Sequence, residues 1–252
     1  MDEENLLDMN TVEVLGYNVF NDTLDSIVVE KPTRVIATIS PNSYGIASRN
    51  AEFRAALRDA DYLVLDGAYF GLGGLLLKGK RIRINNGPNV FRHFMERMDR
   101  AGGRVFFLGS SEATLASIRE RSARDYPRIV VGGFSPPYLP RFSDADVQEM
   151  LDAITSFKPD VVFVGMTAPK QEIWALRNGR RTDAALVASI GAVFDWYAGN
   201  EREIAPIWWK LRLAWLVRTI RRPEILRRYP AIGIFFRDLF LALLGFKHTC
   251  RP

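Results

Sequence analysis

The sequence predicts an α/β protein with a largely parallel, Rossmann-like sheet, helices on both faces and a basic helical appendage at its C-terminal end. Two observations predict the sheet: short β-branched or apolar runs alternate with segments of helical spacing, and most of these runs are followed by Gly, Ser or Thr. A change in composition near Ala205-Pro206 predicts the appendage. We therefore expect an α/β body over residues 1–205 and the appendage over residues 206–252.

Six strands are expected, at residues 34–38, 62–65, 104–108, 128–131, 160–164 and 185–190. Helical spacing follows several of them, for example over residues 111–125 and 143–157, and Ser143 is a suitable N-cap for the second of these helices. Such alternation is typical of a parallel sheet covered on both faces. Ligands of these sheets bind beyond the carboxyl ends of the strands, so the residues that follow each strand are candidates for function.

The appendage is predicted to begin with an amphipathic helix. Trp209, Leu213, Leu216 and Ile220 recur at helical spacing and form one apolar stripe, and Pro223 should end or kink that helix. The stretch that follows, residues 231–246, is very apolar but too short to span a bilayer. We expect it either to lie at an interface or to pack on the body.

Charge is distributed unevenly along the chain. Residues 207–252 hold ten Lys/Arg against two Asp/Glu, a net charge of +8, so the preceding residues carry −3 of the chain's total of +5. A basic tail on a weakly acidic body points to an anionic partner, which is phosphate, a membrane surface or nucleic acid. The aromatic residues interleaved with the basic ones exceed what a solvated helix face needs.

Composition excludes several classes of protein. The single Cys excludes a disulfide scaffold and suits a reducing compartment, and two His offer little for a metal centre or a Ser-His-Asp triad. The acidic N-terminal segment MDEENLLDMN lacks the apolar core of a signal peptide, and no run of eighteen apolar residues occurs. We expect a cytoplasmic protein without a cofactor.

Two groups of side chains near predicted strand ends can carry acid–base chemistry. Asp66 follows the strand at residues 62–65, where its carboxylate either accepts a proton from a ligand or only starts a turn. Gln171 and Glu172 fall in the first turn of a helix predicted to begin near Pro169, where they either cap the helix or face the ligand. Glu172 is therefore the rival of Asp66 for the role of general base.

A third group is the arginine cluster of the tail, whose guanidinium groups match a diphosphate in bidentate fashion. Its members are Arg218, Arg221, Arg222, Arg227 and Arg228. No Asp-x-Asp pair follows a predicted strand and no GxGxxG fingerprint occurs, so neither a divalent metal site nor a dinucleotide site is expected.

Three sequence blocks point to a family. They are Leu-Asp-Gly at residues 65–67, Pro-Lys-Gln-Glu-Ile-Trp at residues 169–174 and Ile-Gly-Ala-Val-Phe-Asp-Trp-Tyr-Ala-Gly at residues 190–199. In this order, and with the Trp- and Arg-containing tail up to Tyr229, the chain resembles the WecG/TagA/CpsF glycosyltransferase family over roughly residues 18–229.

The resemblance implies an inverting, metal-independent transferase. Such enzymes move a sugar from a UDP-sugar to a polyprenyl-diphosphate-linked saccharide on the inner face of the cell membrane, in cell-surface or exopolysaccharide synthesis. It implies that Asp66 is the catalytic base. Ser40 and Asn42 match a strand-end Thr-x-Asn pattern, with Ser in place of Thr, and Gln171 matches a pocket Gln with Glu172 beside it.

In the tail, the resemblance implies an appendage that closes over the diphosphate and touches the membrane. Arg218 and Arg228 match its first and last arginines, and Arg221 lies between them. Two positions depart from the family: Ala214 replaces a Glu, and Ile225 replaces a middle Arg for which the neighbouring Arg227 can substitute.

A further departure concerns a loop that we expect on the acceptor side. The family's Arg-x-x-Gly-x-Asp pattern falls on Arg83 to Asn89, with Arg one position early and Asn in place of Asp. The transferred sugar is therefore left open among glucose, N-acetylmannosamine and its uronic acid.

Two other functions would use the same basic tail. A nucleic-acid-binding module is disfavoured because no RRM, KH or helix-turn-helix signature occurs and the tail is more apolar than a phosphate-tracking helix requires. A non-catalytic membrane-associated scaffold is disfavoured because Asp66 and Gln171 stand in matching context. We expect no nucleic-acid partner, and the sequence leaves self-association into a homo-oligomer open.

Overall fold

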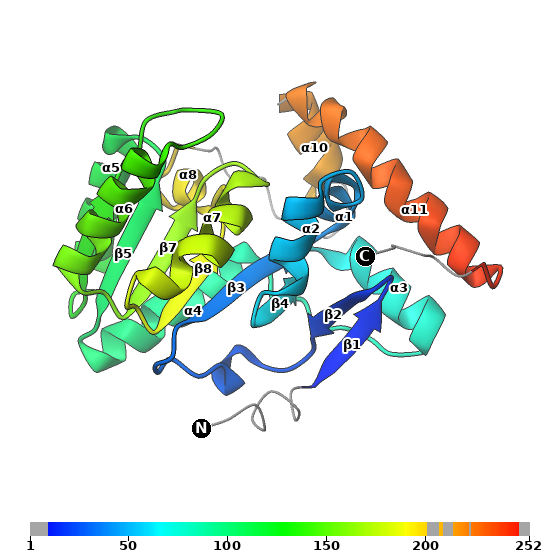
Figure 1. Ribbon diagram of the computed structural model, residues 1–252, viewed down its shortest axis with the longest axis horizontal. Coiled ribbons are helices and arrows are strands. Elements are labelled where there is room, and N and C mark those ends of the chain that lie inside the picture. Colours follow the sequence, from blue (N-terminus) through cyan, green and yellow to red (C-terminus); the bar gives the residue numbers. More distant parts are fainter. Residues whose placement is uncertain (1–9, 201–206, 209–213, 222, 247–252) are drawn as a thin grey trace.

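A six-stranded parallel sheet forms the centre of the computed structural model, which describes residues 10–200, 207–208, 214–221 and 223–246 (Figure 1). The strands are β3 (Arg34–Ile39), β4 (Tyr62–Leu65), β5 (Arg104–Gly109), β6 (Val130–Phe134), β7 (Val161–Gly165) and β8 (Leu186–Ser189). They lie in the order β4-β3-β8-β7-β5-β6, and every neighbouring pair is parallel. The expected strands are confirmed, with shifts at several of their ends.

Helices cover both faces of this sheet, as the sequence predicts. They are α1 (Pro41–Ala47), α2 (Ala51–Arg58), α3 (Ala68–Lys78), α4 (Gly87–Ala101), α5 (Glu112–Asp125), α6 (Asp144–Phe157), α7 (Lys170–Asn178) and α8 (Val193–Tyr197). Because successive strand residues point to opposite faces, Phe106 packs with α6 and α7 whereas Phe107 packs with α4, α5 and α8. The strands are apolar on both sides for this reason.

The carboxyl end of β6 differs from the prediction. Gly132 and Gly133, expected after the strand, lie inside it and pair with Phe106 and Phe107 of β5. A Cβ atom on Gly132 would lie 2.7 Å from the Phe157 ring of α6, so glycine is needed there for packing against the helix. The first residue after the strand is Ser135, whose hydroxyl donates to the Ser110 carbonyl at 2.7 Å.

A hairpin near the N-terminal end is an element that our sequence analysis missed. It consists of β1 (Thr11–Val14) and β2 (Tyr17–Phe20), which pair antiparallel through a two-residue turn. Both turn residues, Leu15 and Gly16, have positive φ, the backbone geometry of tight hairpins. The hairpin contributes buried side chains to the cluster that also contains residues of β3, β4, α1, α2 and α3.

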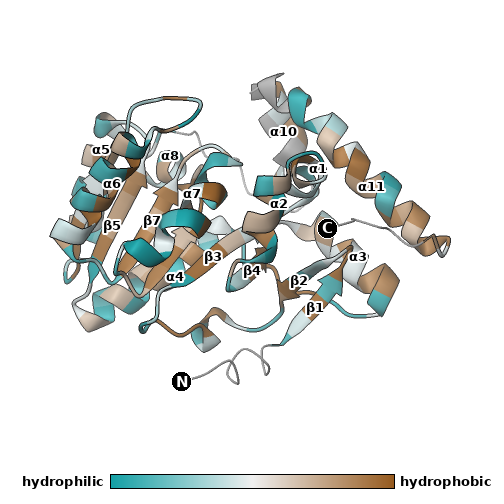
Figure 2. Cartoon of the chain, in the orientation of Figure 1, coloured by the Kyte–Doolittle hydropathy of each residue, from teal (hydrophilic) through white to brown (hydrophobic). Residues whose placement is uncertain are grey.

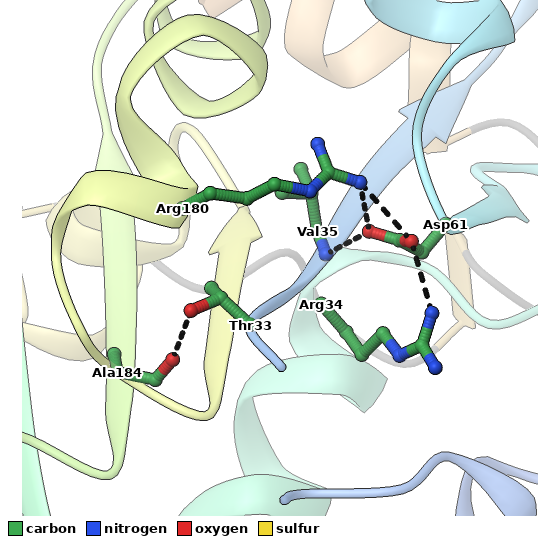
Figure 3. Close-up of polar contacts among 6 residues, drawn as sticks. All are labelled: Thr33, Arg34, Val35, Asp61, Arg180 and Ala184. Carbon is green, nitrogen blue, oxygen red and sulfur yellow. Dashed lines mark hydrogen bonds and ion pairs between the residues drawn. The ribbon is translucent and has the colours of Figure 1, made fainter. Parts of the chain in front are cut away.

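The amino ends of the strands are held together by a buried carboxylate. The Asp61 side chain, 7% exposed, accepts a hydrogen bond from the Val35 amide at 2.8 Å and contacts the guanidinium groups of Arg34 and Arg180 (Figure 3). Nearby, the Thr33 hydroxyl donates to the Ala184 carbonyl at 2.6 Å. These contacts tie β3 to the segments before β4 and β8.

The C-terminal part adds α10 (Ala214–Arg221) and α11 (Tyr229–Leu243), and three 3-10 segments complete the described elements. These short segments are η2 (Leu24–Ser26), η3 (Gly179–Arg181) and η4 (Pro223–Arg228). Helix α11 lies against α1 (Figure 1), and a Cβ atom on Gly45 would lie only 2.0 Å from the Ala231 carbonyl oxygen. This packing confirms one of the two alternatives for residues 231–246.

The inner face of α11 belongs to the core. Ile234, Phe235 and Leu239 share a buried cluster with Tyr44 of α1, and the Tyr44 hydroxyl donates to the buried carboxylate of Asp238 at 3.0 Å. Residues 201–206 lie outside the described residues, so the domain boundary near residue 205 stays a prediction. None of the helices in the described part of the chain has the length and apolarity that a membrane-spanning segment needs.

Candidate active site

The carboxyl ends of β4, β3 and β8 lie side by side and gather most of the candidate residues. The Asp66 amide, directly after β4, donates to the carbonyl of Ile39, the last residue of β3, at 2.8 Å. Asp66 and Ser40 therefore start adjacent post-strand segments. Gly67 has a φ of 88°, which lets the chain turn from the strand into α3 directly after the exposed Asp66.

Ser40 and Asn42 lie where the prediction places them, but their side chains have different surroundings. Ser40 is the N-cap of α1: its hydroxyl accepts from the Ser43 amide while the Ser43 hydroxyl accepts from the Ser40 amide, a reciprocal capping box. Asn42 has a buried Oδ1 with no hydrogen-bond partner. Because buried polar atoms are nearly always satisfied, Asn42 has an acceptor left for a ligand.

Gln171 and Glu172 lie in the first turn of α7, as expected from the sequence, and both side chains are buried. The Gln171 Nε2 donates to Glu172 Oε1 at 2.8 Å, whereas Gln171 Oε1 and Glu172 Oε2 have no partner. A Cβ atom on Gly191, just after β8, would lie 3.4 Å from the Gln171 amide, so this side chain lies at the end of β8. Three further unpartnered atoms are His93 Nε2, Ser122 Oγ and Trp174 Nε1.

The electrostatics connect these two groups. Burial raises the pKa of Glu172 to about 7, the hydrogen bond from Gln171 opposes that shift, and the negative charge of Asp66 adds to it. Asp66 and Glu172 therefore act on each other across the strand ends. An exposed carboxylate next to a buried carboxyl group whose pKa is about 7 is an arrangement suited to proton transfer.

The loop from Arg83 to Asn89 lies at the same edge, because Ile84 forms a parallel bridge with Leu65. The Arg83 amide is fixed by Asn21 Oδ1 at 2.8 Å, and its side chain is exposed. The Asn89 Nδ2 donates to the Ile84 carbonyl at 3.3 Å, so this side chain also shapes the loop. Arg83 is thus the residue of the pair whose side chain faces outward.

The tail arginines are described only in part. The side chains of Arg218 and Arg221 lie outside the described residues, although both positions belong to α10. Arg228 is exposed and is the N-cap of α11, three residues before Ala231, which touches Gly45 of α1. Since α1 also carries Asn42, this packing brings the start of α11 to the helix that lines the site. The Tyr44–Asp238 hydrogen bond that fixes α11 was not foreseen, although an acidic residue within an apolar run was a signal.

Within the described ranges, no group of three or more His, Cys, Asp or Glu side chains is placed to hold a metal ion. Asp146, one of the acids that begin α6, accepts from the Ser143 amide at 2.7 Å in a capping box, which confirms the predicted N-cap.

The fold is that of a parallel α/β protein, a class in which ligands bind at the carboxyl ends of the strands. The chain belongs to the Glycosyl transferase WecG/TagA/CpsF family, whose sequence model matches residues 5–249. It is 29% identical over 198 residues to an N-acetylglucosaminyldiphosphoundecaprenol N-acetyl-beta-D-mannosaminyltransferase of Bacillus spizizenii strain W23, covering 78% of this chain and 75% of the relative. A protein of the same description from Staphylococcus aureus strain MW2 is 23% identical over 233 residues, covering 89% and 90%. The resemblance to the family is confirmed.

Proposed function

We propose that the protein is an inverting, metal-independent glycosyltransferase that moves a sugar from a UDP-sugar to a polyprenyl-diphosphate-linked saccharide. The observation that carries the proposal is the placement of the Asp66 carboxylate at the strand edge, where its charge adds to the rise in the pKa of Glu172 that burial causes. The two mannosaminyltransferase relatives support the reaction class and the lipid-linked acceptor. N-acetylmannosamine is therefore the first sugar to test.

In this reaction Asp66 accepts the proton of the acceptor hydroxyl. As the proton leaves, the hydroxyl oxygen bonds to the anomeric carbon while the bond from that carbon to the diphosphate oxygen breaks and UDP departs. Attack opposite the leaving group converts an α-linked donor into a β-linked product, the configuration in the relatives' names. A positioned general base contributes about 10²–10⁴-fold to the rate.

The leaving diphosphate needs neutralisation of its developing charge. Arg218, Arg221 and Arg228 would supply it, because guanidinium groups bind phosphate oxygens in bidentate fashion. Asn42 and Gln171 offer buried acceptor atoms without partners, which suit the hydroxyl and amide donors of a sugar nucleotide. Glu172 holds the Gln171 amide in place through its 2.8 Å hydrogen bond.

The acceptor would approach over the loop that carries Arg83 and Asn89, beside Asp66. Ser40 would act through its position as the cap of α1, which sets where Asn42 lies. We place the protein in the cytoplasm, peripheral on the inner face of the cell membrane, because its acceptor is held there. Self-association stays open.

The test is a transfer assay with UDP-N-acetylmannosamine and N-acetylglucosaminyldiphosphoundecaprenol, read by mass spectrometry of the lipid product. We expect the product to gain one N-acetylhexosamine residue, with release of UDP. UDP-glucose and the uronic acid donor, run in parallel, decide the sugar. If no UDP-sugar yields a glycosylated lipid with any diphospholipid acceptor while the protein is folded, the proposed function is wrong.

A further inference from the structure

Helix α3 starts two residues after Asp66 and has two different apolar faces. Its inner face packs closely on the hairpin and on the segment after α3: a Cβ atom on Gly73 would lie 2.5 Å from Val14 Cγ1, and one on Gly74 would lie 2.7 Å from Ile82 Cδ1. Phe70 is fully buried, and its ring contacts those of Tyr44 and Phe235. The two glycines thus let the helix approach the body until this face is covered.

The outer face of α3 is apolar and uncovered. Tyr69, Leu72, Leu75 and Leu76 follow at helical spacing on one side of the helix, and their exposed fractions run from 38% to 53%. No charged residue occurs from Gly67 to Leu77. A helix face turned to water is normally polar, so this face indicates a binding partner.

The outer face of α11 continues this surface. Phe236, Phe240, Leu243 and Leu244 recur at helical spacing and are exposed, Phe240 by 60%. The two helices touch, since a Cβ atom on Gly73 would lie 3.9 Å from Leu239 Cδ1 of α11. Figure 2 shows α3 and the C-terminal half of α11 as hydrophobic segments at the same end of the molecule. We call the exposed residues Leu72, Leu75, Leu76, Phe240, Leu243 and Leu244 the α3/α11 surface.

Positive charge borders this surface. Lys80, Arg81 and Arg83 follow α3, are exposed, and form no ion pair with any residue that the structure describes; Lys78 pairs with Glu13 at 3.5 Å. No Asp or Glu occurs between Gly67 and Met95. An anionic partner fits this rim. A second copy of the chain, docked through the same face by a twofold axis, would bring like charges together.

We propose that the α3/α11 surface rests on an anionic lipid bilayer, with Lys80 and Arg81 at the level of the lipid headgroups. Membrane contact is then shared by the α/β body and the C-terminal appendage. The eleven residues of α3 span about 16 Å, so the helix links the proposed base directly to the lipid surface. The inference rests on the proposed function in one respect, namely that a lipid-linked acceptor must reach Asp66 from that surface.

The test is binding of the full chain to vesicles of phosphatidylglycerol and phosphatidylethanolamine, measured by co-sedimentation. Leu72→Ser with Leu76→Ser should weaken binding on the order of tenfold, because both leucines lose apolar contact with lipid. Lys80→Gln with Arg81→Gln should weaken it by about tenfold or more on these vesicles and should leave binding to neutral phosphatidylcholine vesicles unchanged. Turnover on a short-chain, water-soluble acceptor should stay at the wild-type level in both variants.

The matched control is Val130→Ser, an exposed apolar residue at the opposite edge of the sheet, which should bind vesicles like the wild type. Unchanged vesicle binding in both α3 variants would overturn the inference. So would a wild-type dimer, by light scattering, that becomes monomeric in the Leu72/Leu76 variant without loss of vesicle binding. If the α3 variants lose vesicle binding but the wild type transfers no sugar, the proposed function is contradicted and the inference about the α3/α11 surface still holds.

A labelled variant covers the case in which the serine variants fold poorly. Leu72→Cys in a Cys250→Ser background, which removes the single native cysteine, carries one environment-sensitive fluorophore. We expect a blue shift of its emission on anionic vesicles and none for the equivalent Val130→Cys label. Equal shifts, or none at either site, would contradict the placement of α3 on the lipid.

Discussion

Asp61 and Asp66 lie at opposite ends of the same strand, and their surroundings differ. At the amino end of β4, the Asp61 carboxylate accepts from the Val35 amide and contacts Arg34 and Arg180, with 7% of the side chain exposed. At the carboxyl end, burial raises the pKa of another carboxyl group, Glu172, and the charge of the exposed Asp66 adds to that rise. The amino end places opposite charges together, which stabilises a fold. The carboxyl end buries a carboxyl group, Glu172, whose ionised form is disfavoured mainly by that burial, which costs stability and needs another reason.

The same difference extends to the neutral polar groups. At the amino ends, the Thr33 hydroxyl donates to the Ala184 carbonyl and the Val35 amide donates to the Asp61 carboxylate. At the carboxyl ends, Asn42, Gln171 and Glu172 each keep a buried atom without a partner. Buried groups left unsatisfied in a native structure need an explanation, and a bound ligand would supply the missing partners here. We propose that the contrast separates residues that hold the sheet from residues that contact a substrate.

The largest effect should follow from removing the proposed base. We expect Asp66→Asn to lower turnover by about 10²–10⁴-fold, since the acceptor proton has no receiver, while UDP affinity and the melting temperature stay near wild type. Calorimetry measures the affinity for UDP, and a steady-state assay measures turnover. A variant that keeps more than about a tenth of the activity would place the base elsewhere.

The next effect concerns the cost of burying Glu172. Its pKa is about 7 in the fold against an ordinary 4.5, so the folded state holds the proton more tightly than the unfolded chain. Its favourable contribution is fully present below pH 4.5 and is lost as the pH rises through 7, a change of about 3 kcal/mol. Glu172→Gln should remove this slope.

Urea unfolding of Glu172→Gln and wild type at pH 5 and pH 8 measures the slope. The variant should gain stability relative to the wild type at the higher pH. A stability difference that is equal at both values would mean that Glu172 does not titrate in this range.

A loss of stability without loss of chemistry is expected at the amino end. Asp61→Ala leaves the Val35 amide and two guanidinium groups without their acceptor, which should lower the free energy of unfolding by about 2 kcal/mol. Turnover per folded molecule should not change. Denaturant titration and active-site-normalised rates separate the two quantities. A fall in turnover of a fully folded Asp61→Ala variant would contradict the assignment of Asp61 to stability alone.

A smaller effect is expected in the tail. Arg228→Ala should lower turnover about tenfold on a soluble acceptor, because one guanidinium group no longer stabilises the leaving diphosphate. The control is Arg124→Ala, an exposed arginine in the last turn of α5, which should be silent. If Arg228→Ala reduces only vesicle binding and keeps full turnover, the tail is an anchor and not part of the site.

Removal of divalent metal ions is expected to have no effect. Excess EDTA should leave turnover unchanged if the arginines alone neutralise the diphosphate. Loss of activity on chelation, restored by Mg²⁺ or Mn²⁺, would contradict the metal-independent mechanism and direct attention to Asp144 and Asp146.

Much of this arrangement could be predicted from the sequence. The apolar runs of the central strands, the placement of Asp66 after a strand and that of Gln171 and Glu172 at a helix start follow local rules of periodicity and capping. Burial of Glu172 and its interaction with Asp66 could not be predicted, because they depend on which strands are neighbours. The hydrogen bond from the Asn89 amide to the Ile84 carbonyl could not be predicted either, because the sequence does not place that carbonyl nearby.

The hairpin and the packing of α11 were not predicted from the sequence for other reasons. The alternation of Val12, Glu13 and Val14 before Gly16 was a readable strand signal, and it was overlooked because the run is short. For α11 the sequence left two options, and long-range packing of Gly45 against Ala231 shows that one side of the helix packs on the body. Contacts of this kind between distant segments are not encoded in local periodicity.

The most direct test of the account compares the two carboxyl groups of the edge in single-turnover experiments. Asp66→Asn and Glu172→Gln are both isosteric, and each removes one carboxyl group from the pair that the structure brings together. We predict that Asp66→Asn slows sugar transfer by about a hundredfold or more, whereas Glu172→Gln, which retains an acceptor for the Gln171 amide, stays within about tenfold of wild type. The opposite order of rates would make Glu172 the base and contradict the central claim.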